Sequence, residues 1–248
     1  YSYVAYQTAW LKAHHTAAFM AANMCLVLTD SAKIRSFIED LKLWGIKVLP
    51  PDINKSDWFF TTPDEQTVRY GLGGIKGVGE GVIRSLMAER AENGPYKDLF
   101  NFCSRLKRRD NAGVSRRLLE GLVKAGALDS LDPDRGKIFG NIDQALKAAA
   151  DMMEYAGQGS LFGEADEPEE IVSWLDASSW SEHEKLLQEK EVIGFCLTGH
   201  LFDEYRAEIR RFIPESIAKV MSSGKSGASK GQSGGYRSKN TMKMAGVV

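Results

Sequence analysis

Residues 72–87 read LGGIKGVGEGVIRSLM, a glycine-rich turn that runs directly into a helical pattern. The apolar residues after the glycines recur on one helix face, which predicts a helix beginning immediately after Gly79. Gly77 and Gly79 leave backbone amides uncovered at that helix start, where unpaired N–H groups and the positive end of the helix dipole favour an anion. Val78 is predicted to point inward as an apolar anchor, and Lys76 can add a positive charge beside a bound phosphate.

The pattern resembles the hairpin of a helix-hairpin-helix module, in which an apolar residue and Gly-apolar-Gly precede a helix. Such a hairpin binds the sugar–phosphate backbone without reading bases, because backbone amides meet phosphate oxygens that are alike in every sequence. A plain tight turn ahead of a core helix is the alternative. A mononucleotide phosphate loop is disfavoured, because the stretch lacks the signature G-x-x-x-x-G-K-S/T and its glycines do not follow G-x-G-x-x-G.

A second stretch, residues 115–128, repeats the theme with the helix placed before the turn. Its apolar residues form one helical stripe, and an Ala-Gly-Ala turn centred on Gly126 follows. We interpret it as a degenerate second hairpin, with Arg116, Arg117 and Lys124 available to phosphates. A simple helix C-cap at Gly126 is equally consistent with the pattern.

Charge is distributed unevenly along the chain. The 248 residues carry a net charge of −1, so overall composition does not indicate nucleic-acid binding. Residues 97–124 nevertheless hold eight basic residues against three acidic ones, a local charge of +5. This asymmetry predicts a face that contacts DNA, although a solvated charged surface is the alternative.

Several classes of protein are disfavoured by composition. The three cysteines, Cys25, Cys103 and Cys196, are odd in number and widely spaced, which argues against a disulfide framework or a C-x-x-C metal site and favours a reducing cytoplasm. No apolar run approaches the roughly 20 residues of a membrane helix. Asp132 and Asp134 have the spacing of a metal-binding pair, but Pro133 between them predicts a turn.

The fold is predicted to be mainly α with a small β element. Helical patterns cover residues 1–45, with the second helix beginning at Ser31, and another helix begins near Ser181, where Ser181 and Glu184 form a capping box. Residues 157–170 are predicted to be an exposed acidic linker, and residues 221–240 a flexible basic loop. Short strands are predicted at Ile46–Leu49, Trp58–Thr61 and Thr67–Leu72, with a turn at residues 62–64.

Four blocks of sequence resemble the alpha subunit of C-family bacterial DNA polymerases III, in the family's order and spacing. They are YQTAWLKAH at 6–14, LPPDIN at 49–54, GIKGVGEG at 74–81 and KAGALD at 124–129. The chain is thereby identified as an interior to C-terminal fragment of such a subunit. The resemblance implies a later part of the fingers at 1–70, a tandem helix-hairpin-helix region at 71–150, an acidic linker at 151–180, and a helical connector with the truncated start of an OB-fold at 181–248.

The linker contains the peptide QGSLF at residues 158–162, which is similar to the family's internal clamp-binding peptide. The resemblance assigns Gln158, Ser160, Leu161 and Phe162 to the beta sliding clamp. Leu161 and Phe162 have no evident core to join in an exposed linker, whereas a clamp offers an apolar pocket. A staple onto the chain's own domain is the alternative.

The resemblance also implies an activity and its partners. The parent subunit is expected to be a DNA-directed DNA polymerase, which uses magnesium on palm carboxylates that would lie before Tyr1, so no catalytic residue, cofactor or metal is expected in this fragment. Duplex DNA, the sliding clamp and other polymerase III holoenzyme subunits are the expected partners, in the bacterial cytoplasm and without a membrane. A noncatalytic helix-hairpin-helix adaptor is the alternative, and the fingers-like residues 1–70 argue against it.

Overall fold

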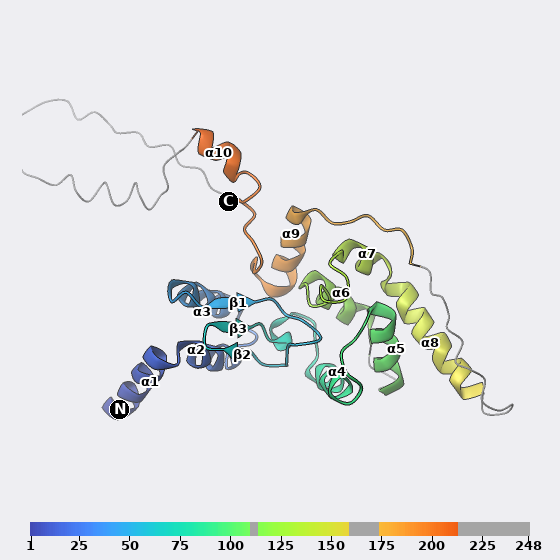
Figure 1. Cartoon of the computed structure of the whole chain (residues 1–248), viewed down its shortest axis with the longest axis horizontal. Helices are drawn as coiled ribbons and strands as arrows, with labels where there is room; N and C mark the ends of the chain where they lie inside the picture. Colours follow the sequence, from blue (N-terminus) through green and yellow to red (C-terminus); the bar gives the residue numbers. More distant parts are fainter. Residues whose placement is uncertain (110–113, 159–173, 213–248) are drawn as a thin grey trace, which may run out of the picture. The chain divides into compact units, whose positions relative to one another are not determined.

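The computed structural model describes residues 1–109, 114–158 and 174–212 (Figure 1). The chain divides into two compact units, Tyr1–Thr198 and Gly199–Val248. The described part is mainly helical with one small sheet, as the sequence predicts. The predicted OB-fold start falls largely on residues 213–248, outside the described part, and the boundaries expected near residues 70, 150 and 180 remain predictions.

Helices make up most of the first unit. They are α1 (Ser2–His14), α2 (Thr16–Cys25), α3 (Ser31–Leu43), α4 (Glu80–Asn93), α5 (Leu99–Arg109), α6 (Arg116–Lys124), α7 (Arg135–Gly140), α8 (Ile142–Gln158) and α9 (Glu182–Ile193), with a short 3₁₀ helix, η1 (Leu72–Gly74). The second unit contributes α10 (Arg206–Phe212). None of the described helices is both long enough and apolar enough to cross a membrane.

Short polar side chains cap the beginning of several helices. The Asp30 carboxylate accepts a hydrogen bond from the Lys33 amide at 3.1 Å and caps α3. The Ser181 hydroxyl accepts from the Glu184 amide at 3.2 Å, which confirms the predicted start of α9. Each bond satisfies one of the amides that a helix leaves unpaired in its first turn.

The sheet contains three short strands in the order β1-β3-β2. β1 pairs with β3 in parallel, with Val48 opposite Val68, and β2 pairs with β3 antiparallel. β3 stops at Arg69, short of the predicted Leu72, because η1 begins there. The strands are β1 (Lys47–Leu49), β2 (Thr61–Asp64) and β3 (Thr67–Arg69).

The second strand lies where the sequence predicted a turn. We expected a strand at Trp58–Thr61 followed by a turn at 62–64, whereas β2 itself occupies 61–64. Pro63 is tolerated because β2 is an edge strand and needs no amide there to pair. The turn is displaced to the next residues, where the Asp64 carboxylate accepts from the Gln66 amide at 2.8 Å.

The glycine-rich turn is built on the core of the first unit. Leu72 and Ile75 on its near side are buried, as are Ile83 and Leu86 of α4. Leu122 of α6 belongs to the same continuous apolar cluster. The core therefore fixes both ends of the turn and leaves its tip at the surface.

Candidate nucleic-acid interface

The first turn, residues 75–79, joins η1 to α4 and leaves the amides of Gly77 and Gly79 without a hydrogen bond within the described part of the chain. Gly77 has a φ of +83°, a conformation that strains any residue with a Cβ, and it is exposed. Gly79 is the N-cap of α4 and provides no side-chain cap. Within the described part of the chain, the amides of Gly77 and Gly79 make no hydrogen bond. Such amides at a helix start are suited to bind an anion.

Helix α6 packs against this turn at Gly121. A Cβ placed on Gly121 would lie 3.4 Å from the Lys76 carbonyl oxygen and 3.8 Å from Cγ2 of Val78. Val78 is half-buried and packs against the core, in the role the sequence predicts. These are ordinary van der Waals distances, so α6 packs directly against the turn at position 121.

Arg117 places a cation at the tip of the turn. Its side chain is exposed, and a Cβ placed on Gly77 would lie 3.4 Å from the Arg117 Nε. Arg117 makes no hydrogen bond or ion pair with the residues that the structure describes. The guanidinium therefore lies beside the uncovered amides with its donors available.

Lys76 and Lys124 point toward the end of α9. The Lys76 amide donates to the Val192 carbonyl at 2.9 Å, and its Nζ donates to the Glu191 carbonyl at 3.5 Å. Lys124 Nζ lies 2.9 Å from Oε2 of Glu191. Both predicted phosphate ligands thus contact a helix that lies far away in sequence.

Arg116 is also engaged, in ion pairs on the protein surface. Its Nε lies 2.7 Å from Glu120 Oε1, and its Nη1 contacts the Asp143 carboxylate. Hydrogen bonds from Arg116 to Glu120 and Asp143 raise the pKa of the Arg116 guanidinium. A phosphate at this residue would have to replace those two carboxylates.

Gly126 ends α6 as a helix C-cap, the second of the two interpretations of its turn. Its φ is +77°, its amide donates to Val123, and the next amide, that of Ala127, donates to Leu122, both at 2.9 Å. This pair of bonds is the Schellman arrangement. Gly126 is buried beneath Arg135, so its amide is not presented to a ligand.

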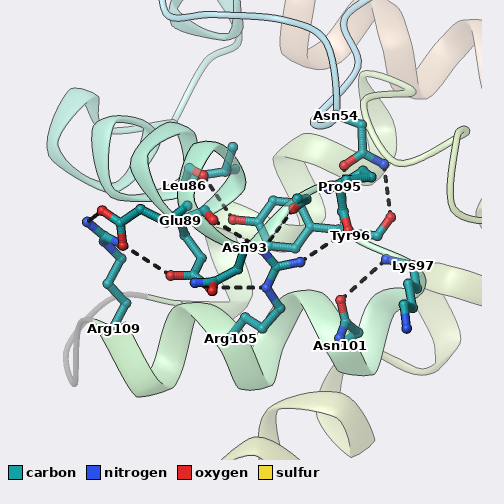
Figure 2. Close-up of polar contacts among 12 residues, drawn as sticks. Asn54, Leu86, Glu89, Asn93, Pro95, Tyr96, Lys97, Asn101, Arg105 and Arg109 are labelled. Atoms are coloured by element: carbon teal, nitrogen blue, oxygen red, sulfur yellow. Dashed lines mark hydrogen bonds and ion pairs between the residues drawn. The ribbon is translucent and has the colours of Figure 1, made fainter.

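Two further arginines of the basic segment, Arg105 and Arg109, form ion pairs inside the protein (Figure 2). Arg105 Nε lies 3.1 Å from Glu89 Oε1, and its other nitrogens donate to backbone carbonyls at the end of α4, including that of Gly94 at 2.9 Å. The guanidinium also covers the Tyr96 ring at 4.4 Å. Arg109 Nη1 lies 3.2 Å from Oε2 of Glu89. These contacts hold α5 against α4.

Glu89 is the buried centre of this cluster. Burial alone would raise the pKa of its carboxyl, but hydrogen bonds from Arg105, Asn93 and Arg109 outweigh burial and hold the pKa below its ordinary value. The charge count of the segment therefore overstates the cations available to DNA. Arg105 and Arg109 lie on α5, and their partner Glu89 lies on α4, so the sequence of the basic segment alone does not show that these two cations are paired.

Two predictions remain, the turn around Pro133 and the clamp-binding peptide at 158–162. Asp134 caps α7, and Asp132 pairs with Lys137 at 2.7 Å, which confirms the turn predicted around Pro133. Gln158 is the last residue of α8. Ser160, Leu161 and Phe162 lie outside the described residues, so the clamp-binding peptide remains a prediction.

Comparison with known proteins agrees with this geometry. Residues 45–138 match a helix-hairpin-helix motif. The DNA polymerase III subunit alpha of Neisseria meningitidis serogroup A is 42% identical over 220 residues, which is 89% of this chain and 19% of that protein. The subunit alpha of Vibrio cholerae is 40% identical over 216 residues and that of Escherichia coli K12 is 40% identical over 217, in each case 86% of this chain and 18% of the relative. The chain thus spans about a fifth of the length of these relatives. The predicted resemblance is confirmed: over most of its length this chain is similar to DNA polymerase III alpha subunits, and it matches a helix-hairpin-helix motif.

Proposed function

We propose that this chain is part of the catalytic subunit of a bacterial replicative DNA polymerase, and that it holds duplex DNA by the sugar–phosphate backbone. The uncovered amides of Gly77 and Gly79 beside the exposed Arg117 carry the proposal. Amides and a guanidinium bind phosphate oxygens that are the same at every base pair, so binding is independent of sequence. A polymerase that moves along its template needs such a grip.

The parent subunit would perform template-directed DNA synthesis, a nucleotidyl transfer assisted by magnesium. In this proposal the catalytic carboxylates belong to other parts of the subunit, and the present residues position the duplex. The similarity to alpha subunits over 89% of the chain extends well beyond the helix-hairpin-helix match at 45–138. That extent favours a polymerase subunit, working in the cytoplasm with other holoenzyme subunits, over a noncatalytic adaptor.

Removing one amide from the turn tests the grip. Gly79→Pro deletes the amide hydrogen, and the native φ of −91° is negative, as the proline ring requires. We expect affinity for a fluorescently labelled duplex to fall by at least about tenfold, since a hydrogen bond to a charged group contributes roughly 1.5–3 kcal/mol. Arg117→Gln should also lower the slope of log K against log salt by about 1. Fluorescence anisotropy at several salt concentrations measures both quantities.

Gly81→Ala is the matched control. A Cβ at Gly81 meets no atom within 4 Å, and the substitution keeps the amide. Its duplex affinity should equal that of the parent chain. Equal binding by Gly79→Pro and the parent, or a strong preference for one DNA sequence, would remove the proposed grip.

We further propose that residues 158–162 bind the sliding clamp. The proposal rests on the resemblance of QGSLF to the family's clamp-binding peptide. Burial of Leu161 and Phe162 in an apolar pocket would contribute roughly 3–6 kcal/mol before the cost of ordering the peptide. The contact becomes effective because the clamp encircles DNA that the same chain holds, which raises the local concentration of one site for the other.

Truncating both apolar side chains tests the clamp contact. The double variant Leu161→Ala, Phe162→Ala should reduce capture of purified clamp by at least about tenfold in a pull-down. Duplex binding by the same variant should be unchanged, because the turn at 75–79 is untouched. Undiminished capture by the double variant would end the clamp proposal and leave the DNA proposal standing.

A further inference from the structure

Helix α9 contacts the first turn, residues 75–79, through its last residues. The Lys76 amide donates to Val192, and the Lys76 ammonium lies beside the carbonyl of Glu191. A Cβ placed on Gly194, which ends α9 with a φ of +98°, would lie 3.8 Å from Lys76 Nζ. An ammonium at this end of a helix is favoured by the helix dipole. The end of α9 is therefore attached to the phosphate-binding turn by both backbone and side chain.

The same helix is connected to the second turn, residues 125–129, indirectly, because Glu189 of α9 and Asp129 of the turn both lie beside Arg135 of α7. Arg135 forms a paired contact with Asp129, with Nε and Nη2 at 2.8 and 2.7 Å from the two carboxylate oxygens. Arg135 Nη1 lies 4.0 Å from Oε1 of Glu189, and a Cβ on Gly126 would clash with Nη2 at 2.1 Å. One buried arginine thus lies between the second turn and α9, hydrogen-bonded to Asp129 and within 4.0 Å of the Glu189 carboxylate.

Glu189 also holds the chain that follows α9. Its Oε2 accepts from the amides of Leu197 and Thr198 at 2.7 and 3.1 Å, and the side chain is fully buried. Glu189 is close enough to Tyr70, just before η1, for its charge to add to the effect of burial and raise the pKa of the Tyr70 hydroxyl. Contacts to the first turn, to the following segment and, through Arg135, to the second turn therefore lie within the last two turns of α9.

We propose that α9 is a brace that fixes the two turns relative to each other, and that Lys76 and Lys124 hold this brace rather than DNA. Arg117 is then the cation of this site that meets phosphate. The inference rests on the proposed binding of duplex DNA and changes which side chains perform it. Lys124 is a positioning residue, because its side chain is only 17% exposed and its ammonium is directed at Glu191.

Exchanging the charges of Lys124 and Glu191 tests whether Lys124 holds α9 or contacts a DNA phosphate. In the brace, Lys124→Glu and Glu191→Lys each place like charges together and loosen α9, so each should weaken duplex affinity about threefold. The double variant restores the ion pair in the opposite orientation and should bind as the parent does. Fluorescence anisotropy with the full chain and a labelled duplex measures all four proteins.

A direct phosphate contact by Lys124 gives the opposite pattern. Glu191→Lys would then strengthen binding by adding a positive charge, and the double variant would bind as weakly as Lys124→Glu, with a salt slope lower by about 1. That pattern would overturn the brace. Lys124→Gln and Glu191→Gln give a milder pair if either charge reversal unfolds the chain.

Failure of DNA binding itself is distinguishable from failure of the brace. A parent chain that binds no duplex contradicts the proposed function, and the same four proteins then test the brace through thermal unfolding. Destabilisation by each single variant that the double variant relieves supports the brace. Additive effects of the two substitutions on unfolding overturn it.

Discussion

Replacing Gly126 by alanine should lower the free energy of unfolding by roughly 3–5 kcal/mol, one of the two largest effects expected in this chain. The φ of +77° already disfavours a Cβ, and the new atom would lie 2.1 Å from Nη2 of Arg135. Arg135 would have to give up its paired contact with Asp129 while its side chain remains buried. Urea unfolding followed by circular dichroism measures the loss.

Gly45→Ala is the matched control, because Gly45 has the same backbone conformation as Gly126 but no side chain such as Arg135 beside it. Gly45 has a φ of +72° and ends α3 with the same two bonds, from its own amide to Lys42 and from the Ile46 amide to Leu41. A Cβ there meets nothing within 4 Å. Gly45→Ala should cost only about 1 kcal/mol. Equal losses at the two positions would show that contact with Arg135 is unimportant.

Arg105→Ala should cost a similar amount, roughly 3–5 kcal/mol, because it breaks a buried ion pair and leaves Glu89 without its main partner. The Arg105 and Glu89 side chains are 15% and 8% exposed. The substitution also frees carbonyls at the end of α4 that Arg105 now satisfies, including that of Gly94. Thermal and urea unfolding should both show the loss.

Arg84→Ala provides the comparison within the same pair of helices. Arg84 is 66% exposed, and its ion pair with Glu80 lies on the surface of α4. Removal of such a pair should cost no more than about 0.5 kcal/mol. A large loss from Arg84→Ala, or a small one from Arg105→Ala, would contradict the structural role assigned to Arg105.

The Arg105 effect should depend on pH with a definite sign. The pKa of Glu89 is held below its ordinary value, so its stabilising contribution is complete above the unfolded pKa of about 4.3 and is lost as pH falls through the lower folded value. The difference in unfolding free energy between parent and Arg105→Ala should therefore shrink in acid. A difference that stays constant down to that range would assign the effect to packing alone.

Local features of the fold were accessible from the sequence. The turn at Gly77 and Gly79, the inward Val78 and the cap at Ser181 each depend on residues within a few positions of one another. Turn chemistry and helix caps are set at that range. β2 was misplaced because Pro63 indicates a turn unless the strand is known to lie at a sheet edge.

The partners of the charged residues were not accessible. Arg105 and Arg109 read as free cations until Glu89 is placed beside them, and Lys124 reads as a phosphate ligand until Glu191, 67 residues away, is brought to it. No spacing rule connects residues at such separations, since tertiary packing decides them. Arg116 and Arg117 are adjacent and alike in sequence, but the fold places Arg116 beside Asp143 and Arg117 beside Gly77.

The attachment of α9 to the first turn also fixes an order of events during synthesis. Lys76 and Glu191 are 115 residues apart. At a ribosomal rate of about 5–20 residues per second, the turn is made roughly 6 to 23 seconds before its partner. The nascent chain therefore carries the turn through that interval without α9, and only chains extended past Ile193 can complete the attachment.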